Sequence, residues 1–141
     1  MEFTMRLTAA PFEKVRDGSK KIELRLYDEK RRQIKIGDTI LFISLKDPND
    51  TVLTRVSDIY RFASFEDLYK ALPLVDLGYS DRDMTTASPK DMEKFYSPEE
   101  QAQYGVVGLR LDLLPPKNDE IHHGRYEEAE SRETFVGVLS A

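Results

Sequence analysis

The segment GSKKIELR, residues 18–25, combines the alternation of a β-strand with a row of charged side chains. Over residues 21–26 three charged residues, Lys21, Glu23 and Arg25, alternate with the apolar residues Ile22, Leu24 and Leu26. Successive side chains of a strand point to opposite faces, so the charges share one face. The pattern predicts a strand over residues 20–27 with one buried face. The charged row is then either a solvated ladder of salt bridges or the floor of a binding site.

The residue types of this row are suited to holding an anion. Arg25 can grip a phosphate or carboxylate through two parallel hydrogen bonds, and Lys20 or Lys21 can supply a point charge. Glu23 can orient Arg25 or a lysine, or accept a hydrogen bond from a base amino group or a ribose hydroxyl. Lys20 stands at the start of the strand and points to the other face unless the chain bends there. The spacing therefore leaves open which lysine enters the site.

The rest of the chain predicts a mixed set of strands and helices. Strands are expected over residues 5–8, 39–45, 51–62 and 105–113 in addition to the charged strand. A helix over 11–18 begins with Pro11 and ends at Gly18, a residue that readily adopts a left-handed conformation. This order of elements favours an α+β fold, in which a small, curved antiparallel or mixed sheet closes into a β-barrel.

Serine residues mark the starts of three further helices. Ser64 precedes a helix that Pro73 ends, and Ser88 and Ser97 are each followed by proline at the first helical position. Ser97 and Glu100 have the spacing of a capping box. These signals predict two short helices over 89–95 and 98–103, and the several short helices are expected on one side of the barrel.

Length and composition suggest one domain followed by a polar extension. The 141 residues suffice for a single hydrophobic core without metal or disulfide support. We expect the domain to cover residues 1–114, and residues 115–141 to form a polar extension in which 134–139 could add one last strand. The chain has no cysteine, which excludes disulfides, thiolate metal sites and a cysteine nucleophile.

Charge and targeting signals narrow the functional classes. The net charge of −5 argues against unselective nucleic-acid binding, but residues 1–46 carry 11 Lys and Arg against 7 Asp and Glu. No leader sequence and no long apolar run is visible, so we expect a cytoplasmic protein without a membrane segment. His122 and His123 are adjacent and lack a third ligand, so we expect no metal and no cofactor.

Four residues of the opening segment fit the pattern G-x-K-x-x-E-x-R: Gly18, Lys20, Glu23 and Arg25. This pattern resembles the signature of the ASCH domain (activating signal cointegrator homology), a branch of the PUA-like superfamily. The surrounding segments 5–42, 61–73 (RFASFEDLYKALP) and 97–111 (SPEEQAQYGVVGLRL) are also similar, so the resemblance spans about residues 4–113. It implies a PUA-like β-barrel with a cleft lined by the motif and a role on RNA or nucleotides.

One branch of the family hydrolyses the acetyl group of an acetylated cytidine nucleoside. That branch uses a lysine, a threonine three residues later and a distant glutamate. The resemblance places Lys20 at the lysine position, but Glu23 stands where the threonine is expected. The hydroxyl nucleophile is therefore absent, and the resemblance implies Lys20 and Glu23 as catalytic residues only if the carboxylate acts as a base on water.

Aromatic and basic residues outside the motif could extend such a site. Tyr79 and Tyr104 are the best candidates to stack on a base. Lys30, Arg31, Arg32 and Lys35 form a basic segment that could follow a phosphate backbone or could be a solvated turn.

Three functions are compatible with these residues. The first is an RNA- or nucleotide-binding module that uses Lys20, Lys21, Glu23, Arg25 and Tyr104. The second is a small hydrolase in the same cleft, which acts on a modified nucleoside or cleaves RNA. The third is a regulatory domain that binds a small metabolite.

Overall fold

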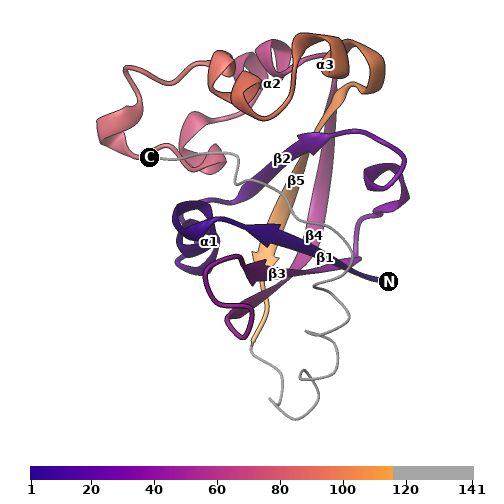
Figure 1. Ribbon diagram of the computed structural model, residues 1–141, viewed down its shortest axis with the longest axis vertical. Coiled ribbons are helices and arrows are strands. Elements are labelled where there is room, and N and C mark those ends of the chain that lie inside the picture. Colours follow the sequence, from indigo (N-terminus) through magenta and orange to yellow (C-terminus); the bar gives the residue numbers. More distant parts are fainter. Residues whose placement is uncertain (116–141) are drawn as a thin grey trace.

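Five strands form one sheet in the computed structural model, which describes residues 1–115. The spatial order is β1 (Glu2–Leu7), β3 (Thr39–Ser44), β4 (Thr51–Phe62), β5 (Val106–Leu113) and β2 (Ile22–Leu26). β1 pairs with β3 in parallel, and the other neighbours are antiparallel. The mixed sheet curls into a half-barrel (Figure 1), so the prediction of an α+β, PUA-like fold is confirmed.

The long strand β4 links the two parts of this sheet. Its first half, from Thr51 to Arg55, pairs with β3, whereas its second half extends beside β5 as far as Phe62. The register with β5 shifts between Val56 and Asp58. Such a bulge bends a strand and increases its twist, which helps the sheet to curl. Figure 1 shows β4 and β5 running together along the length of the molecule.

The helical segment between β4 and β5 gathers at one end of the sheet (Figure 1). Its members are α2 (Phe65–Ala71), η2 (Leu74–Leu77), η3 (Asp81–Asp83), η4 (Pro89–Lys94) and α3 (Pro98–Tyr104), and the η elements are 3-10 helices. The predicted cap of α3 is present, because Ser97 Oγ accepts from the Glu100 N–H and the Glu100 side chain accepts from the Ser97 N–H. None of these helices exceeds seven residues, which is typical of segments held by packing rather than by their own propensity.

Two helix predictions need correction. The helix predicted over 89–95 is the 3-10 helix η4, a form that proteins use in short pieces. The first helix, α1, runs over Ala9–Arg16, so Pro11 is its third residue and not its first. Proline is tolerated there because the first four N–H groups of a helix have no partner within the helix. One further 3-10 helix, η1 (Arg31–Gln33), lies within the predicted basic turn.

Two hydrophobic clusters lie on the two faces of β2 and β5. Ile22, Leu24 and Leu26 pack with Phe65, Leu68 and other residues of the helical layer. On the opposite face, Val107 and Leu109 belong to a second cluster with α1, β1 and β3. Glu23 pairs with Leu109, and Arg25 pairs with Val107. Paired residues share a face of the sheet, so the strand directs both charged side chains into the half-barrel.

The described residues form one sheet with its helices. The domain boundary at residue 114 stays a prediction. The predicted extension over 115–141 and its last strand lie outside the described residues, apart from residue 115. Within residues 1–115, no helix is long and apolar enough to cross a membrane.

Gly18 connects α1 to the strand that carries the charged row, and its φ of 84° lies in the left-handed region. A Cβ atom built there would meet only Leu113 Cδ1, at 3.8 Å, so a substitution changes the backbone energy and not the packing. We predict that Gly18→Ala lowers the free energy of unfolding by about 1 kcal/mol. Urea unfolding followed by circular dichroism measures this change, with Ser19→Ala at the exposed neighbour as the control. Equal losses in both variants would contradict the prediction.

Candidate functional site

Lys20, Glu23 and Arg25 come together around β2. The Lys20 Nζ atom lies 3.4 Å from Glu23 Oε1, and Arg25 Nη2 lies 2.7 Å from Glu23 Oε2. Arg25 Nε donates to the same Oε2 at 2.7 Å. All three side chains have an exposed fraction of 0%. Glu23 and Arg25 of the charged row therefore form a buried ion-pair cluster with Lys20, and not a solvated salt-bridge ladder.

The two lysines of the motif have different environments. Lys20 precedes β2, so the alternation of the strand does not reach it, and its side chain turns back to Glu23. Lys21 is exposed, and its backbone N–H donates to the Asp76 carbonyl at 2.8 Å. Of the two alternatives that the spacing leaves open, the structure brings Lys20 to Glu23 and Arg25.

Burial changes the acidity of Lys20. Its ammonium group donates to the carbonyl oxygens of Ile22 at 3.0 Å and Leu77 at 3.1 Å. Burial lowers the pKa of Lys20 to about 8, although the Glu23 carboxylate opposes this effect. Desolvation disfavours the charged form of an amine, so a substantial fraction of Lys20 is neutral in mildly alkaline solution. A lysine of this kind can take up a proton as a general base.

Arg25 remains charged in the same surroundings. Burial acts to lower its pKa, but Glu23 and Tyr96 outweigh this effect, so the pKa of Arg25 is raised above its ordinary value. Tyr96 lies beside Arg25 and stacks on Phe65 with a centroid distance of 5.8 Å. Burial raises the pKa of Tyr96, and the guanidinium of Arg25 opposes the rise. The Tyr96 phenol therefore stays protonated and can donate a hydrogen bond.

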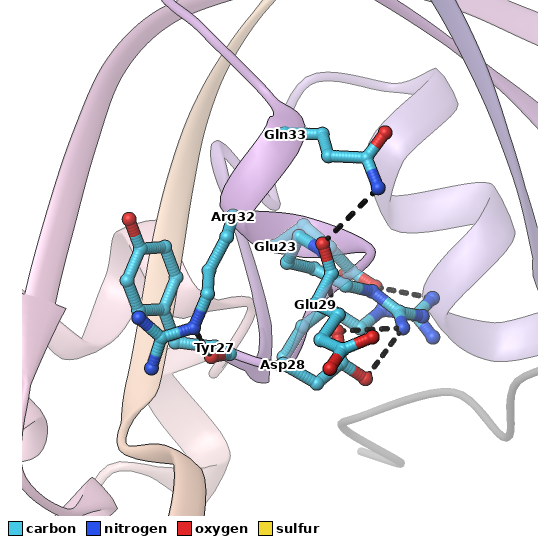
Figure 2. A network of polar contacts seen from close by, with 8 residues as sticks. Glu23, Tyr27, Asp28, Glu29, Arg32 and Gln33 are labelled. Atoms are coloured by element: carbon cyan, nitrogen blue, oxygen red, sulfur yellow. Dashed lines mark hydrogen bonds and ion pairs between the residues drawn. The ribbon is translucent and has the colours of Figure 1, made fainter.

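A second ion pair, in which the arginine is buried and the aspartate is partly exposed, lies at the start of η1. Arg31 Nη1 contacts Asp28 Oδ1 at 3.2 Å and Oδ2 at 2.9 Å, and the backbone N–H of Arg31 also donates to Oδ1. Figure 2 shows Asp28 with dashed contacts to its carboxylate. Arg31 is only 3% exposed, and its charge opposes the rise in the pKa of Tyr96. Arg31 is thus electrostatically coupled to the tyrosine that lies beside Arg25. No local pattern in the sequence predicts this coupling, because Asp28 and Arg31 lie in a charged segment typical of a solvated turn.

A hollow of about 280 Å³ adjoins Arg31. Its lining includes the apolar side chains of Phe3, Met5 and Ile34 from β1 and the segment after η1, together with Lys30. An apolar lining with a few polar groups is the usual composition of a small-molecule site.

The other predicted site residues lie elsewhere. Tyr104 is half-buried at the end of α3 and packs against the helix-side cluster, and its carbonyl accepts from Arg32 at 3.4 Å. The interpretation of Tyr79 as a base-stacking residue is wrong, because its ring is buried in that cluster and its hydroxyl donates to Asp91. Within residues 1–115, no group of three acidic or histidine side chains could hold a metal ion, and His122 and His123 lie outside this range.

The curled mixed sheet with its short helices defines an α+β domain of the PUA-like class. The ASCH domain model matches residues 5–115, so the chain belongs to the ASCH domain family, and the resemblance of the motif is confirmed. ASCH domains are generally linked to RNA binding. The search of curated proteins gave no significant match.

Solved structures support this assignment. The crystal structure of the hypothetical protein PH0355 has 33% sequence identity to this chain and a TM-score of 0.67. The match covers 81% of this chain and 100% of the PH0355 chain. Protein PF0455 from Pyrococcus furiosus has 34% sequence identity to this chain and a TM-score of 0.60. The match covers 82% of this chain and 100% of the PF0455 chain. An ASCH protein from Zymomonas mobilis has the same fold at 14% identity, with a TM-score of 0.56 and coverages of 88% and 78%.

The lowered pKa of Lys20 predicts a pH-dependent stability. Between pH 8 and 10.5 the unfolded chain still binds the Lys20 proton, whereas the folded protein has lost it. The free energy of unfolding then rises with pH, by about 2–3 kcal/mol from pH 7 to pH 10 for this group alone. Lys20→Met removes this rise. The free energy of unfolding of the wild type minus that of the variant should therefore increase with pH.

Chemical denaturation at several pH values measures this difference. Lys21→Met is the matched control, because it removes an exposed lysine from the neighbouring position. Parallel stability profiles for wild type and Lys20→Met would show that Lys20 titrates normally in the folded protein.

Proposed function

We propose that this protein binds RNA or a nucleotide through the cluster formed by Lys20, Glu23 and Arg25. One observation supports this proposal above the others: an ammonium and a guanidinium converge on a single carboxylate in the segment that carries the G-x-K-x-x-E-x-R motif. Membership of a family generally linked to RNA binding supports the class of ligand.

Each member of the cluster has a separate role in this proposal. Glu23 accepts from both Nε and Nη2 of Arg25, which fixes the plane of the guanidinium before a ligand arrives. A guanidinium in a fixed plane can recognise phosphate through parallel hydrogen bonds with little loss of conformational entropy. Lys20 adds a second cation on the other oxygen of the same carboxylate. Glu23 is therefore a positioning residue, and the two cations contact the anion.

Burial of the cluster determines how a ligand gains access. The three side chains are covered, so the groups around them must move aside before a phosphate can make direct contact. The hollow that Arg31 lines offers a first contact, because it opens beside a buried guanidinium and has an apolar wall for a base. We therefore expect binding to be coupled to a local opening of the structure.

The binding test compares the two neighbouring lysines. Loss of a charged hydrogen bond is worth about 1.5–3 kcal/mol, so Lys20→Met should weaken the binding of uridine 5′-monophosphate by about 10- to 100-fold. Lys21→Met removes the same formal charge from an exposed position and should change the dissociation constant by less than about two-fold. Isothermal titration calorimetry measures both, and circular dichroism confirms that the variants are folded.

Two results would contradict the binding proposal. One is equal affinity in wild type and Lys20→Met, which would remove the cluster from the ligand site. The other is the absence of binding both to the mononucleotide and to an oligouridylate at low salt, where phosphate contacts are strongest.

The second candidate function is hydrolysis of an acylated nucleoside, and the lowered pKa of Lys20 favours it. In this reaction the neutral amine of Lys20 takes a proton from water while the water oxygen attacks the acyl carbon. Arg25 stabilises the negative oxygen that forms. The carbon–nitrogen bond then breaks, the leaving amine takes the proton back from Lys20, and the products are a carboxylic acid and the free nucleoside.

We expect hydrolysis of N4-acetylcytidine to accelerate as the pH rises through about 8, because the neutral fraction of Lys20 increases. Chromatographic detection of cytidine measures the rate, which Lys20→Met should abolish and Lys21→Met should preserve. If no cytidine appears above the uncatalysed rate at any pH between 7 and 9, the protein is not a hydrolase of this substrate.

A further inference from the structure

The Tyr27 ring lies close to two exposed arginines. The Arg32 guanidinium carbon is 4.5 Å from the ring centroid, and that of Arg61 is 5.7 Å from it. Arg32 comes from η1 and Arg61 from the end of β4, so two distant segments meet at this ring. Figure 2 shows the Arg32 side chain alongside Tyr27. We call these three residues the Tyr27 cluster.

Hydrogen bonds fix the geometry of the Tyr27 cluster. Arg32 Nε donates to the Tyr27 carbonyl at 3.0 Å, and Arg32 Nη2 donates to the Tyr104 carbonyl at 3.4 Å. Arg61 Nη1 donates to the Tyr27 hydroxyl at 3.4 Å. The two guanidinium groups are thus held in place while they remain exposed to solvent. A preset geometry reduces the entropy that a ligand must remove on binding.

The groups that Arg32 and Arg61 contact differ from those of three other arginines of the protein. Arg16, Arg31 and Arg110 each contact an aspartate. Within residues 1–115, Arg32 and Arg61 contact only carbonyl oxygens, a phenol and the face of one ring. The Tyr27 ring attracts both guanidinium groups weakly, but an uncharged ring does not neutralise their two positive charges. An anion between or beside the guanidinium groups would do so.

The Tyr27 cluster adjoins the proposed nucleotide site. Arg61 pairs with Val107, which pairs in turn with Arg25, so the three side chains share one face of the sheet. Tyr27 follows Arg25 by two residues along the same chain. η1 also connects the two regions, because Arg31 turns inward to Asp28 while Arg32 turns outward to Tyr27.

We propose that the Tyr27 cluster binds the phosphodiester backbone of single-stranded RNA next to the nucleotide held by Lys20 and Arg25. Arg32 and Arg61 contact a phosphate, and an unpaired base stacks on the plane of Arg32. Single strands suit this arrangement, because their bases are free to stack on aromatic rings and guanidinium planes. The inference rests on the proposed function and extends it from one nucleotide to a chain.

Arg32→Gln and Arg61→Gln test this proposal, and Arg55→Gln is the matched control. Arg55 is also an exposed arginine of β4, but it lies in the half of the strand that pairs with β3 and donates to the Gly37 carbonyl. Affinities for an octauridylate and for uridine 5′-monophosphate are measured over a series of salt concentrations, together with the unfolding stability of each variant.

We expect the variant with both Arg32→Gln and Arg61→Gln to bind the octauridylate about 10-fold more weakly at low salt. The slope of its plot of log affinity against log salt concentration should be shallower by about 1.4, the change expected for two lost phosphate contacts to a single strand. Its affinity for the mononucleotide should stay within about two-fold of wild type, since the Tyr27 cluster contacts the neighbouring phosphate. Arg55→Gln should leave both affinities unchanged. A purely structural role would lower stability without changing the salt dependence.

Other outcomes separate this inference from the proposed function. If the double variant binds the octauridylate with the wild-type affinity and salt dependence, the inference is wrong while RNA binding itself stands. If wild type binds neither ligand in calorimetry, the proposed function fails, and the arginine Nε–Hε signals in nuclear magnetic resonance decide the inference. Shifts of the Arg32 and Arg61 signals on addition of octauridylate support the Tyr27 cluster as a phosphate site, and unchanged signals overturn it.

Discussion

The candidate site depends on one interaction, the contact of the buried Glu23 carboxylate with two cations. The carboxylate contacts a lysine through one oxygen and an arginine through the other, in a region without solvent exposure. Removing one member of a buried ion pair typically costs about 3–5 kcal/mol, because a charge is then left without compensation. Replacing such groups by apolar residues of similar size is often neutral or favourable, so their presence is not explained by stability alone. This argument supports the proposal that the cluster serves ligand binding in addition to the fold.

The fold provides this site through the edge position of β2. Five residues of this strand are buried, although they alternate between apolar and charged side chains. The apolar face is covered by the helical layer, and the charged face points into the half-barrel beside Val107 and Leu109. The helical segment inserted between β4 and β5 contributes Leu77, whose carbonyl accepts a hydrogen bond from the Lys20 ammonium. The same segment contributes Tyr96, which lies beside Arg25. The insertion therefore encloses the cluster as well as completing the core.

The cations of this region fall into two groups with different physical properties. Lys20, Arg25 and Arg31 are buried beside carboxylates, where a charge is costly to desolvate, and the pKa values of Lys20 and Arg25 are shifted. Arg32 and Arg61 are exposed to solvent around an aromatic ring. Inner groups of the first kind are suited to one specific contact or to proton transfer, whereas outer groups are suited to a flexible polyanion. This division is compatible with selective binding by a protein whose net charge is −5.

Much of this protein was determined by local sequence. Period-two alternation located β2, and the serine caps located α2, α3 and η4, because these signals act between residues that are close in the chain. The G-x-K-x-x-E-x-R motif also predicted that Lys20, Glu23 and Arg25 belong to one site. Only the tertiary structure decided that Lys20 and not Lys21 joins them, that Tyr79 belongs to the core, and that Arg31 and Arg32 diverge. Those outcomes depend on contacts between segments far apart in the sequence, which set burial and charge but leave no periodic pattern.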